Sequence, residues 1–241
     1  MMRTTNEAAG EGPRMTPARA LPTLAGLALA SGIGAILAAL GTLPPSWLFV
    51  LKPLTTALVI AYAWPRGADA PKQRRLVLVG LVLSLAGDVA LLWPKEGFLP
   101  GLVAFLLAHL AYIAAFCVPL RLAARPVVFA VYGGVAALIL TQLWPGIPTA
   151  LRAPVVAYVV CLATMAAQAG AWWRSSVARG SADAAFARSA ALGGALFMVS
   201  DSLLAINKFA SALPLASLWI LATYWVAQGC IAAALRPATS P

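Results

Sequence analysis

The sequence predicts an all-α, polytopic integral membrane protein, a helical bundle of about eight transmembrane helices. Three observations predict this class. Hydrophobic residues make up 62% of the 241 residues and charged residues only 10%, whereas soluble domains have about 45–50% and 25%. Several apolar stretches reach the roughly 18 residues that suffice to span a hydrocarbon core. The connections between these stretches are short, which leaves no room among them for a soluble domain.

Eight candidate spans follow one another, each ended by Pro, Gly or charged residues. They cover residues 21–40, 47–64, 76–93, 98–117, 126–143, 153–173, 187–207 and 214–235. The first apolar run continues to Leu40. Because signal-peptide apolar regions are shorter, we expect a first transmembrane helix there. One domain, 21–235, is therefore expected between a disordered cytoplasmic tail (1–20) and a short cytoplasmic tail (236–241).

The formal net charge of +10 is better explained by membrane orientation than by a nucleic-acid partner. If the N-terminus is inside, most Lys and Arg residues fall in cytoplasmic segments, and the external segments hold only Lys95, Arg152 and Lys208. This distribution follows the positive-inside rule. We expect a multi-pass protein of the cell membrane with both termini in the cytoplasm, and no nucleic-acid partner.

The two halves of the sequence show a weak internal similarity. LSLAGDVALL at 83–92 is similar to LFMVSDSLLA at 196–205, and LLAHLAYIAA at 106–115 is similar to ILATYWVAQG at 220–229. The offset is four predicted helices, which preserves helix direction, so a 4+4 parallel internal repeat is one interpretation. Chance similarity between apolar segments is the other. A repeat would make Asp88 and Asp201 equivalent and place them opposite each other in the bundle.

Asp88 and Asp201 are the two acidic residues, out of seven, that lie inside apolar spans. Ionisable residues at such positions are costly and often functional. Both spans run outward, and at 1.5 Å per residue both carboxyl groups lie about 8–9 Å below the outer boundary. Two carboxyl groups at one depth can form a single site in which one is protonated and the other ionised, as acid–base hydrolysis requires. The alternative is a structural role in pairs with Lys52 or Lys208.

Other polar side chains fall mainly in the outer half of the predicted bundle. The spans 21–40, 126–143 and 153–173 offer little that is comparable. Each polar residue has a structural alternative, either a hydrogen bond between helices or, for the lysines, anchoring at the interface. A single histidine with two aspartates is a poor zinc set, so we expect no metal. The additional candidates are His109, Tyr112, Thr223 and Tyr224 near the acids, and Lys52, Asn207 and Lys208 near the outer face.

Five stretches occur in an order and spacing that resemble the YhhN-like family, the lysoplasmalogenases. They are KPLTTALVIAYA (52–63), LSLAGDVALLWP (83–94), GLVAFLLAHLAYIAAF (101–116), GALFMVSDSLLAINKF (194–209) and LATYWVAQ (221–228). The resemblance implies a multi-span hydrolase that cleaves the vinyl ether bond of lysoplasmalogens. The products would be a fatty aldehyde and glycerophosphocholine or glycerophosphoethanolamine. It also implies that Asp88 and Asp201 are essential.

We therefore expect acid–base catalysis by Asp88 and Asp201, without assigning which is the acid. His109, Tyr112, Thr223 and Tyr224 are expected to support catalysis, and Lys52, Asn207 and Lys208 to hold the phosphate head group. The expected partners are a lysophospholipid substrate and membrane lipid, without a cofactor; a homo-oligomer is left open. The alternative functions are a proton-coupled transporter and a lipid hydrolase of different bond or head-group specificity.

Overall fold

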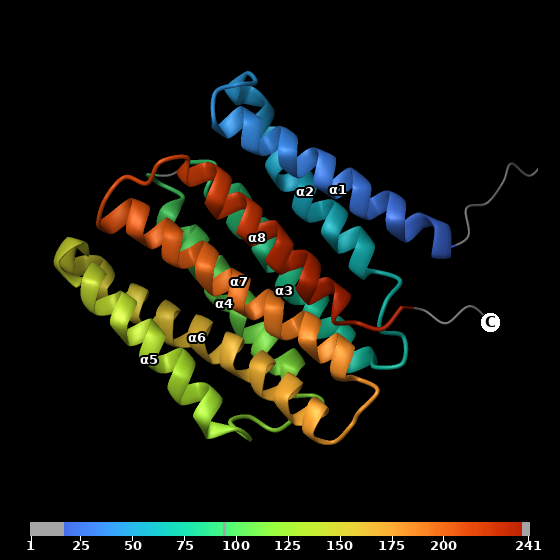
Figure 1. Ribbon diagram of the computed structural model, residues 1–241. Helices are drawn as coiled ribbons and strands as arrows, with labels where there is room; N and C mark the ends of the chain where they lie inside the picture. Colours follow the sequence, from blue (N-terminus) through green and yellow to red (C-terminus); the bar gives the residue numbers. More distant parts are fainter. Residues whose placement is uncertain (1–16, 94, 238–241) are drawn as a thin grey trace, which may run out of the picture.

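The computed structural model describes residues 17–93 and 95–237, and this part of the chain is all α-helical apart from single 3-10 turns. Consecutive helices run antiparallel, and the described ends of the chain lie at the same end of the bundle (Figure 1). The predicted tail residues 1–16 and 238–241 lie outside the described residues. The helices are α1 (Pro17–Ala39), α2 (Leu48–Ala63), α3 (Pro71–Ala90), α4 (Phe98–Phe116), α5 (Pro126–Leu143), α6 (Thr149–Ala178), α7 (Ala184–Phe209) and α8 (Ala216–Ala233).

Seven of the eight described helices are long and apolar enough to cross a membrane. The exception is α3, because Lys72, Arg74 and Arg75 in its first turns and Asp88 near its other end interrupt its apolar sequence. Even so, α3 packs extensively against α4 within the same bundle. The predicted class, a polytopic helical membrane bundle, is confirmed. The 4+4 repeat stays a prediction.

Several helices extend beyond the apolar stretches from which they were predicted. The clearest case is α6, which has 30 residues where hydropathy indicated only 153–173. Likewise α3 begins at Pro71, and proline is favoured in the first helical turn because its missing N–H needs no partner there. Hydropathy detects the part of a helix that lies in hydrocarbon, whereas the helical hydrogen bonds continue into the polar boundary.

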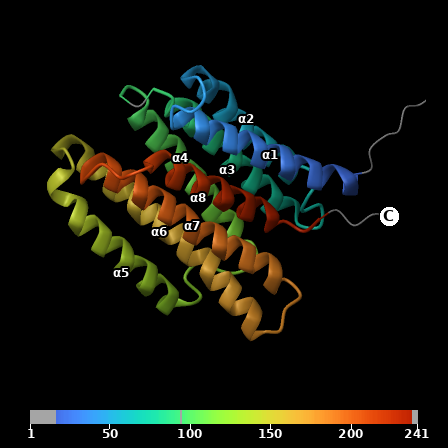
Figure 2. The ribbon, with the colours of Figure 1, turned by 45° about the horizontal axis from the view of Figure 1, so that its top comes forward.

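The bundle has three parts in space. The helices α3, α4, α7 and α8 form its centre, the α1–α2 hairpin covers one side and the α5–α6 hairpin the other (Figures 1 and 2). α7 packs most closely against α8 and α6, whereas α5 packs chiefly against α6. The two aspartate-bearing helices, α3 and α7, therefore run in the same direction through the central part.

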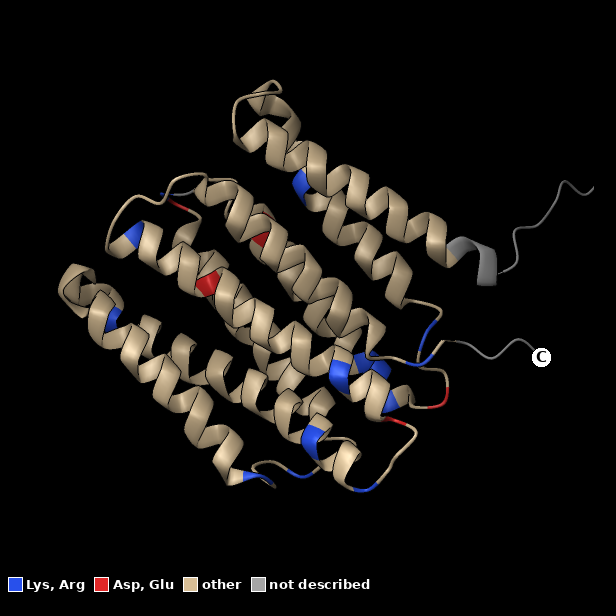
Figure 3. Cartoon of the chain, viewed as in Figure 1, with Lys and Arg blue, Asp and Glu red and all other residues tan. Residues whose placement is uncertain are grey.

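Polar and apolar side chains are distributed as a membrane protein requires. Large apolar side chains such as Leu29, Val127 and Leu138 are exposed on the outside, where lipid can cover them. The buried interior contains hydroxyl, amide and charged groups, which must satisfy one another because hydrocarbon offers no hydrogen bonds. Most Lys and Arg residues gather at the end of the bundle where the C-terminus leaves (Figure 3). We call this the basic end.

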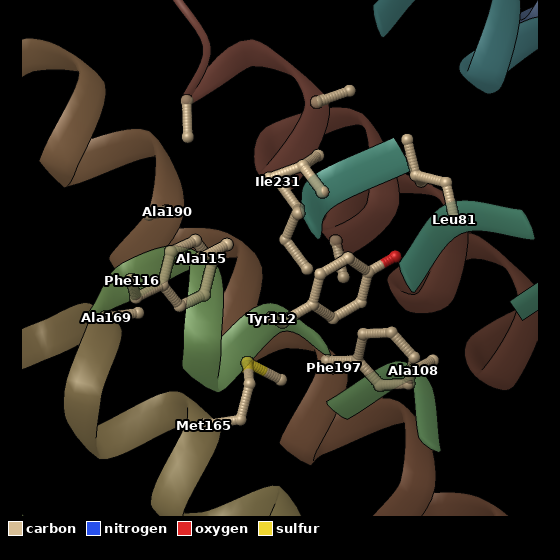
Figure 4. Packing of buried hydrophobic residues seen from close by; sticks show 14 of the residues in the cluster. Leu81, Ala108, Tyr112, Ala115, Phe116, Met165, Ala169, Ala190, Phe197 and Ile231 are labelled. Atoms are coloured by element: carbon tan, nitrogen blue, oxygen red, sulfur yellow. The ribbon is translucent and has the colours of Figure 1, made fainter. Parts of the chain in front are cut away.

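Close packing of α3 against α4 depends on two glycines that lie two helical turns apart on α3. A Cβ atom at Gly80 would overlap the ring of Tyr112, and one at Gly87 would overlap the ring of Phe105. Small residues allow such close approach between membrane helices. Figure 4 shows the rings of Tyr112 and Phe197 at the centre of the buried packing. Close packing here fixes the helix that carries Asp88.

Candidate active site

A cavity of about 500 Å³ lies toward the end of the bundle opposite the basic end, and both intramembrane aspartates line it. All eight helices contribute to its lining, which is mostly apolar. Its charged and titratable lining residues are Lys52 on α2, Asp88 on α3, Tyr158 on α6, Asp201 and Lys208 on α7, and Tyr224 on α8. The cavity thus combines a lipid-like interior with two carboxyl groups.

Asp88 is held by donors from two helices and by a buried cation. Thr56 Oγ1 donates to Asp88 Oδ2 at 2.5 Å, and the Tyr224 hydroxyl donates to the same oxygen at 2.7 Å. Lys52 Nζ lies 3.7 Å from Asp88 Oδ1. The side chain of Asp88 is only 2% exposed. Both of its oxygens therefore face donors or a positive charge.

A further set of hydrogen bonds fixes the direction of the bonds to Asp88. Trp225 Nε1 donates to Thr56 Oγ1 at 3.2 Å, and Gln228 Nε2 donates to the Tyr224 hydroxyl oxygen at 3.2 Å. An indole N–H and an amide NH₂ can only donate, so each hydroxyl keeps its own proton for Asp88. This arrangement suits an ionised carboxylate, which only accepts.

Asp201 has a more open environment with fewer donors. The Tyr158 hydroxyl donates to Asp201 Oδ2 through a short hydrogen bond. His109 Nε2 lies 3.0 Å from the Tyr158 oxygen and 3.7 Å from Asp201 Oδ2. The Asp201 side chain is 13% exposed, and its Oδ1 has no hydrogen-bond or ionic partner among the described residues. One oxygen is therefore available to carry a proton toward the cavity.

The ring of Phe197 connects the surroundings of the two carboxyl groups. Its centroid lies 4.6 Å from that of His109, beside Asp201, and 5.5 Å from that of Tyr224, beside Asp88. Phe105 packs edge-on against both Phe197 and Tyr224. These aromatic rings link the side chains around the two aspartates through apolar contacts.

The remaining sequence-predicted residues lie at different distances from the cavity. Tyr112 is fully buried and donates to Gln228 Oε1 at 2.8 Å, so it reaches Asp88 only through other side chains. The Thr223 hydroxyl donates to the Trp219 carbonyl of its own helix at 2.7 Å.

At the mouth of the cavity, Asn207 and Lys208 also differ from each other. Asn207 Oδ1 accepts the Leu213 N–H at 2.9 Å and so closes the turn after α7. Lys208 lines the cavity with its Nζ 4.0 Å from the centre of the Phe98 ring. The ammonium of Lys208 therefore lies beside an aromatic face, whereas that of Lys52 is paired with a carboxylate.

Sequence reasoning missed Tyr158 and Thr56, which contact the two aspartates directly. The expectation that the span 153–173 contributes little was wrong, because α6 supplies Tyr158. Thr56 could have been found, since it lies one helical turn after Lys52 and so shares its face. The sequence around Tyr158 is apolar and offers no comparable indication. Among residues 17–93 and 95–237, no three His, Cys, Asp or Glu side chains gather to hold a metal.

Comparison with known proteins identifies the family. The family model described as the YhhN family matches residues 47–235. Human lysoplasmalogenase TMEM86B is 34% identical over 185 residues, covering 76% of this chain and 73% of the relative. The pig TMEM86B is 38% identical over 194 residues, covering 76% and 74%.

Two further relatives extend the comparison. Human lysoplasmalogenase TMEM86A is 36% identical over 159 residues, covering 65% of this chain and 63% of the relative. The Escherichia coli O157:H7 protein named uncharacterized membrane protein YhhN is 34% identical over 134 residues, covering 54% and 62%. No solved structure matches the chain significantly. The match over residues 47–235 contains both aspartates and the side chains that bond to them, and the chain belongs to the YhhN family.

Proposed function

We propose that the chain is a lysoplasmalogenase, a membrane-embedded hydrolase that cleaves the vinyl ether bond of lysoplasmalogens. The substrates would be alkenylglycerophosphocholine or alkenylglycerophosphoethanolamine, and the products a fatty aldehyde and the glycerophospho head group. The names of the mammalian relatives support this substrate class. One observation carries the proposal: two aspartates with opposite surroundings line one apolar cavity.

The reaction needs a proton donor, a negative charge and one water molecule. Protonation of the vinyl ether β-carbon forms a C–H bond and leaves an oxocarbenium ion. Water then adds to the cationic carbon, and the hemiacetal collapses to an aldehyde and an alcohol. A positioned acid accelerates the first step, and a fixed carboxylate stabilises the cation that follows. A metal or organic cofactor is not required by these steps.

Asp201 is the proposed acid and Asp88 the proposed ionised partner. Asp201 has one oxygen without a donor, so it can hold a proton toward the cavity. Asp88 accepts from Thr56 and Tyr224 and lies beside Lys52. Burial disfavours the charged form of a carboxyl group, and the two hydroxyl donors and Lys52 offset that cost for Asp88. In the reaction, Asp88 stabilises the oxocarbenium ion and accepts the proton of the attacking water.

The other predicted residues take roles that follow from their contacts. Tyr224 donates a hydrogen bond to Asp88 directly. Tyr112 acts indirectly, because it donates to Gln228, which donates to Tyr224. His109 acts on Asp201 through Tyr158, whose hydroxyl oxygen lies 3.0 Å from His109 Nε2. Thr223 bonds to its own helix, so we assign it no direct contact with a reacting group.

The substrate lies along the cavity with its chain in the apolar part. Lys208 lines the cavity without a carboxylate partner among the described residues, so it is the proposed cation for the lipid phosphate, with Asn207 beside it. Lys52 serves as the cation of Asp88. The apolar part includes the α5 and α6 residues Ala136, Ile139, Leu140, Leu143, Val155, Val159 and Leu162.

We orient the protein with its basic end in the cytoplasm, because Lys and Arg accumulate on that side of membrane proteins. Both termini then lie inside. The cavity and Lys208 lie toward the outer half of the membrane.

The experiment is aldehyde release by the purified protein from synthetic lysoplasmalogen. Saturated ether and acyl lysophospholipids with the same head group report bond specificity, and choline and ethanolamine forms report head-group preference. Asp88→Asn and Asp201→Asn are the test variants, with the exposed loop variant Asp69→Asn as matched control. Proton or substrate flux in liposomes without aldehyde release would support a transporter and contradict the proposal, as would normal aldehyde release by the folded aspartate variants.

A further inference from the structure

His109 is a buried titratable group that the proposed reaction does not use directly. It is 0% exposed and does not line the cavity. Its ring packs against Phe197 and Tyr158, and its Nε2 lies 3.0 Å from the Tyr158 oxygen. Its Nδ1 has no hydrogen-bond partner among the described residues. Its one hydrogen bond to another side chain among the described residues is therefore the one to Tyr158, and the same Nε2 lies 3.7 Å from Asp201 Oδ2.

The position of the imidazole proton decides what Tyr158 can do. If the proton were on Nδ1, it would be a buried donor without an acceptor, which is costly. Nε2 would then accept the hydrogen bond of the Tyr158 hydroxyl, which could no longer donate to Asp201. A hydrogen bond between Tyr158 and Asp201 would then require Asp201 to be protonated on Oδ2. If the proton is on Nε2, His109 donates to Tyr158 and Tyr158 donates to Asp201, whatever the protonation state of Asp201. The second arrangement satisfies both hydrogen bonds.

We propose that Tyr158, oriented by His109, is the positioning residue that makes Asp201 Oδ2 a permanent acceptor and so directs the acid proton to Oδ1, facing the substrate. This inference rests on the proposed role of Asp201 as the acid. The donors run in one direction, from His109 Nε2 to the Tyr158 oxygen and from the Tyr158 hydroxyl to Asp201 Oδ2.

The same chain of donors acts after the proton is transferred. When the O–H bond at Asp201 Oδ1 breaks and the C–H bond of the substrate forms, Asp201 becomes a carboxylate. The Tyr158 hydroxyl stabilises this new charge, because hydrogen bonds to ionised groups are about twice as strong as neutral ones. The proton that Asp88 takes from the attacking water later passes to Asp201, so both carboxyl groups return to their starting states. Tyr158 and His109 end each cycle with the protons they had at the start.

Tyr158 is the group on α6 that faces Asp201, and the other helices supply the remaining charged and titratable groups around the cavity. His109 approaches from α4 and Lys208 lies on α7 itself. The charged and titratable groups that line the cavity with Asp201 are Lys52, Asp88, Tyr158, Lys208 and Tyr224, and His109 lies behind Tyr158. Only Tyr158 donates a hydrogen bond to Asp201 among the described residues, so its removal changes one interaction of the acid.

The kinetic test compares Tyr158→Phe with Tyr132→Phe, which removes a hydroxyl from α5 away from this cavity. Tyr158→Phe should lower kcat about 10- to 100-fold, the range for a hydrogen bond to a charged group, with little change in KM. The loss should appear in kcat because the Tyr158 hydroxyl stabilises the carboxylate that Asp201 becomes when it transfers its proton. Tyr132→Phe should change neither.

His109 variants test whether the histidine acts through the tyrosine. His109→Gln keeps an N–H donor and should retain more activity than His109→Phe. In the Tyr158→Phe background, His109→Phe should cause little further loss in kcat, because coupled groups are not additive. Full, independent losses from the two changes would contradict a single chain of donors.

Infrared spectroscopy of the protein without substrate separates this inference from the proposed function. A carboxylic acid C=O band that Asp201→Asn removes reports the protonated acid. In Tyr158→Phe this band should shift in frequency, whether or not lysoplasmalogen is the substrate. An unchanged band and an unchanged kcat in Tyr158→Phe would overturn the inference, even if the wild-type protein releases aldehyde.

Discussion

Asp88 and Asp201 are the same residue type on parallel helices and line one cavity, yet their surroundings differ. Asp88 is 2% exposed and receives two hydroxyl donors and a lysine. Asp201 is 13% exposed and receives one hydroxyl donor, with a histidine behind it. Around Asp88 both oxygens are occupied, whereas around Asp201 one is available. Donor supply, more than depth in the membrane, therefore distinguishes the two intramembrane carboxyl groups.

This asymmetry is built by ordinary helix contacts. Thr56 and Lys52 lie one turn apart on α2, so one helix face delivers both a donor and a cation to Asp88. Tyr224 and Gln228 lie one turn apart on α8, and Gln228 donates to the Tyr224 hydroxyl that donates to Asp88. Tyr158 is the corresponding donor for Asp201, and it comes from α6. Pairs of carboxyl groups with divergent surroundings are a common basis for acid–base assignments.

The largest effects should follow removal of either carboxyl group. Asp88→Asn and Asp201→Asn should each lower kcat about 100- to 10,000-fold, the range for loss of a general acid or base. Glutamate should separate the two sites. Asp201→Glu should retain measurable activity because one oxygen faces open cavity, whereas Asp88→Glu should be as inactive as Asp88→Asn because fixed donors surround it. Similar kcat values for Asp88→Glu and Asp201→Glu would contradict the proposed difference between the two carboxyl groups.

A smaller effect is expected from the cation beside Asp88. Lys52→Met should lower kcat about 10- to 100-fold, because it leaves a buried carboxylate without its counterion and that carboxylate then takes up a proton. The double variant Lys52→Met, Asp88→Asn should unfold at a higher temperature than either single variant, since each single change leaves one buried group unpaired. Additive losses in thermal stability would show that the two side chains do not interact.

Loss of one hydroxyl donor to Asp88 should have a moderate effect. Tyr224→Phe should lower kcat about 10-fold, which corresponds to one hydrogen bond to a charged group, and Thr56 and Lys52 would keep Asp88 ionised. Steady-state kinetics with Tyr132→Phe as control measures this. If Tyr224→Phe were as inactive as Asp88→Asn, Tyr224 itself would be a reacting group rather than a donor to Asp88.

The smallest effect should come from Lys208, which contacts neither aspartate. Lys208→Met should raise KM about 3- to 10-fold and leave kcat nearly unchanged, because an exposed ionic contact with a phosphate contributes uniform binding of modest strength. Titration with lysophospholipids of the same chain and different head groups measures this. A fall in kcat with unchanged KM would place Lys208 in the chemical step instead of head-group binding.

The sequence predicted the bundle well because hydropathy and charge act on whole segments. Seven of the predicted spans correspond to helices apolar enough to cross a membrane, and the charged first turns of α3 explain the eighth. Asp88 and Asp201 stood out as acids in apolar runs. Tyr158 did not, because an apolar span has no polar face from which the rotation of the helix could be inferred. Thr223 and Tyr224 are sequence neighbours, yet their hydroxyls point to different partners.

At rest, the proposed roles require a protonated Asp201 and an ionised Asp88. Infrared difference spectra of the wild-type, Asp88→Asn and Asp201→Asn proteins at neutral pH distinguish the two carboxyl groups. We expect a carboxylic acid band that is lost in Asp201→Asn and retained in Asp88→Asn. A band that disappears in Asp88→Asn and survives in Asp201→Asn would reverse the two roles and refute the assignment.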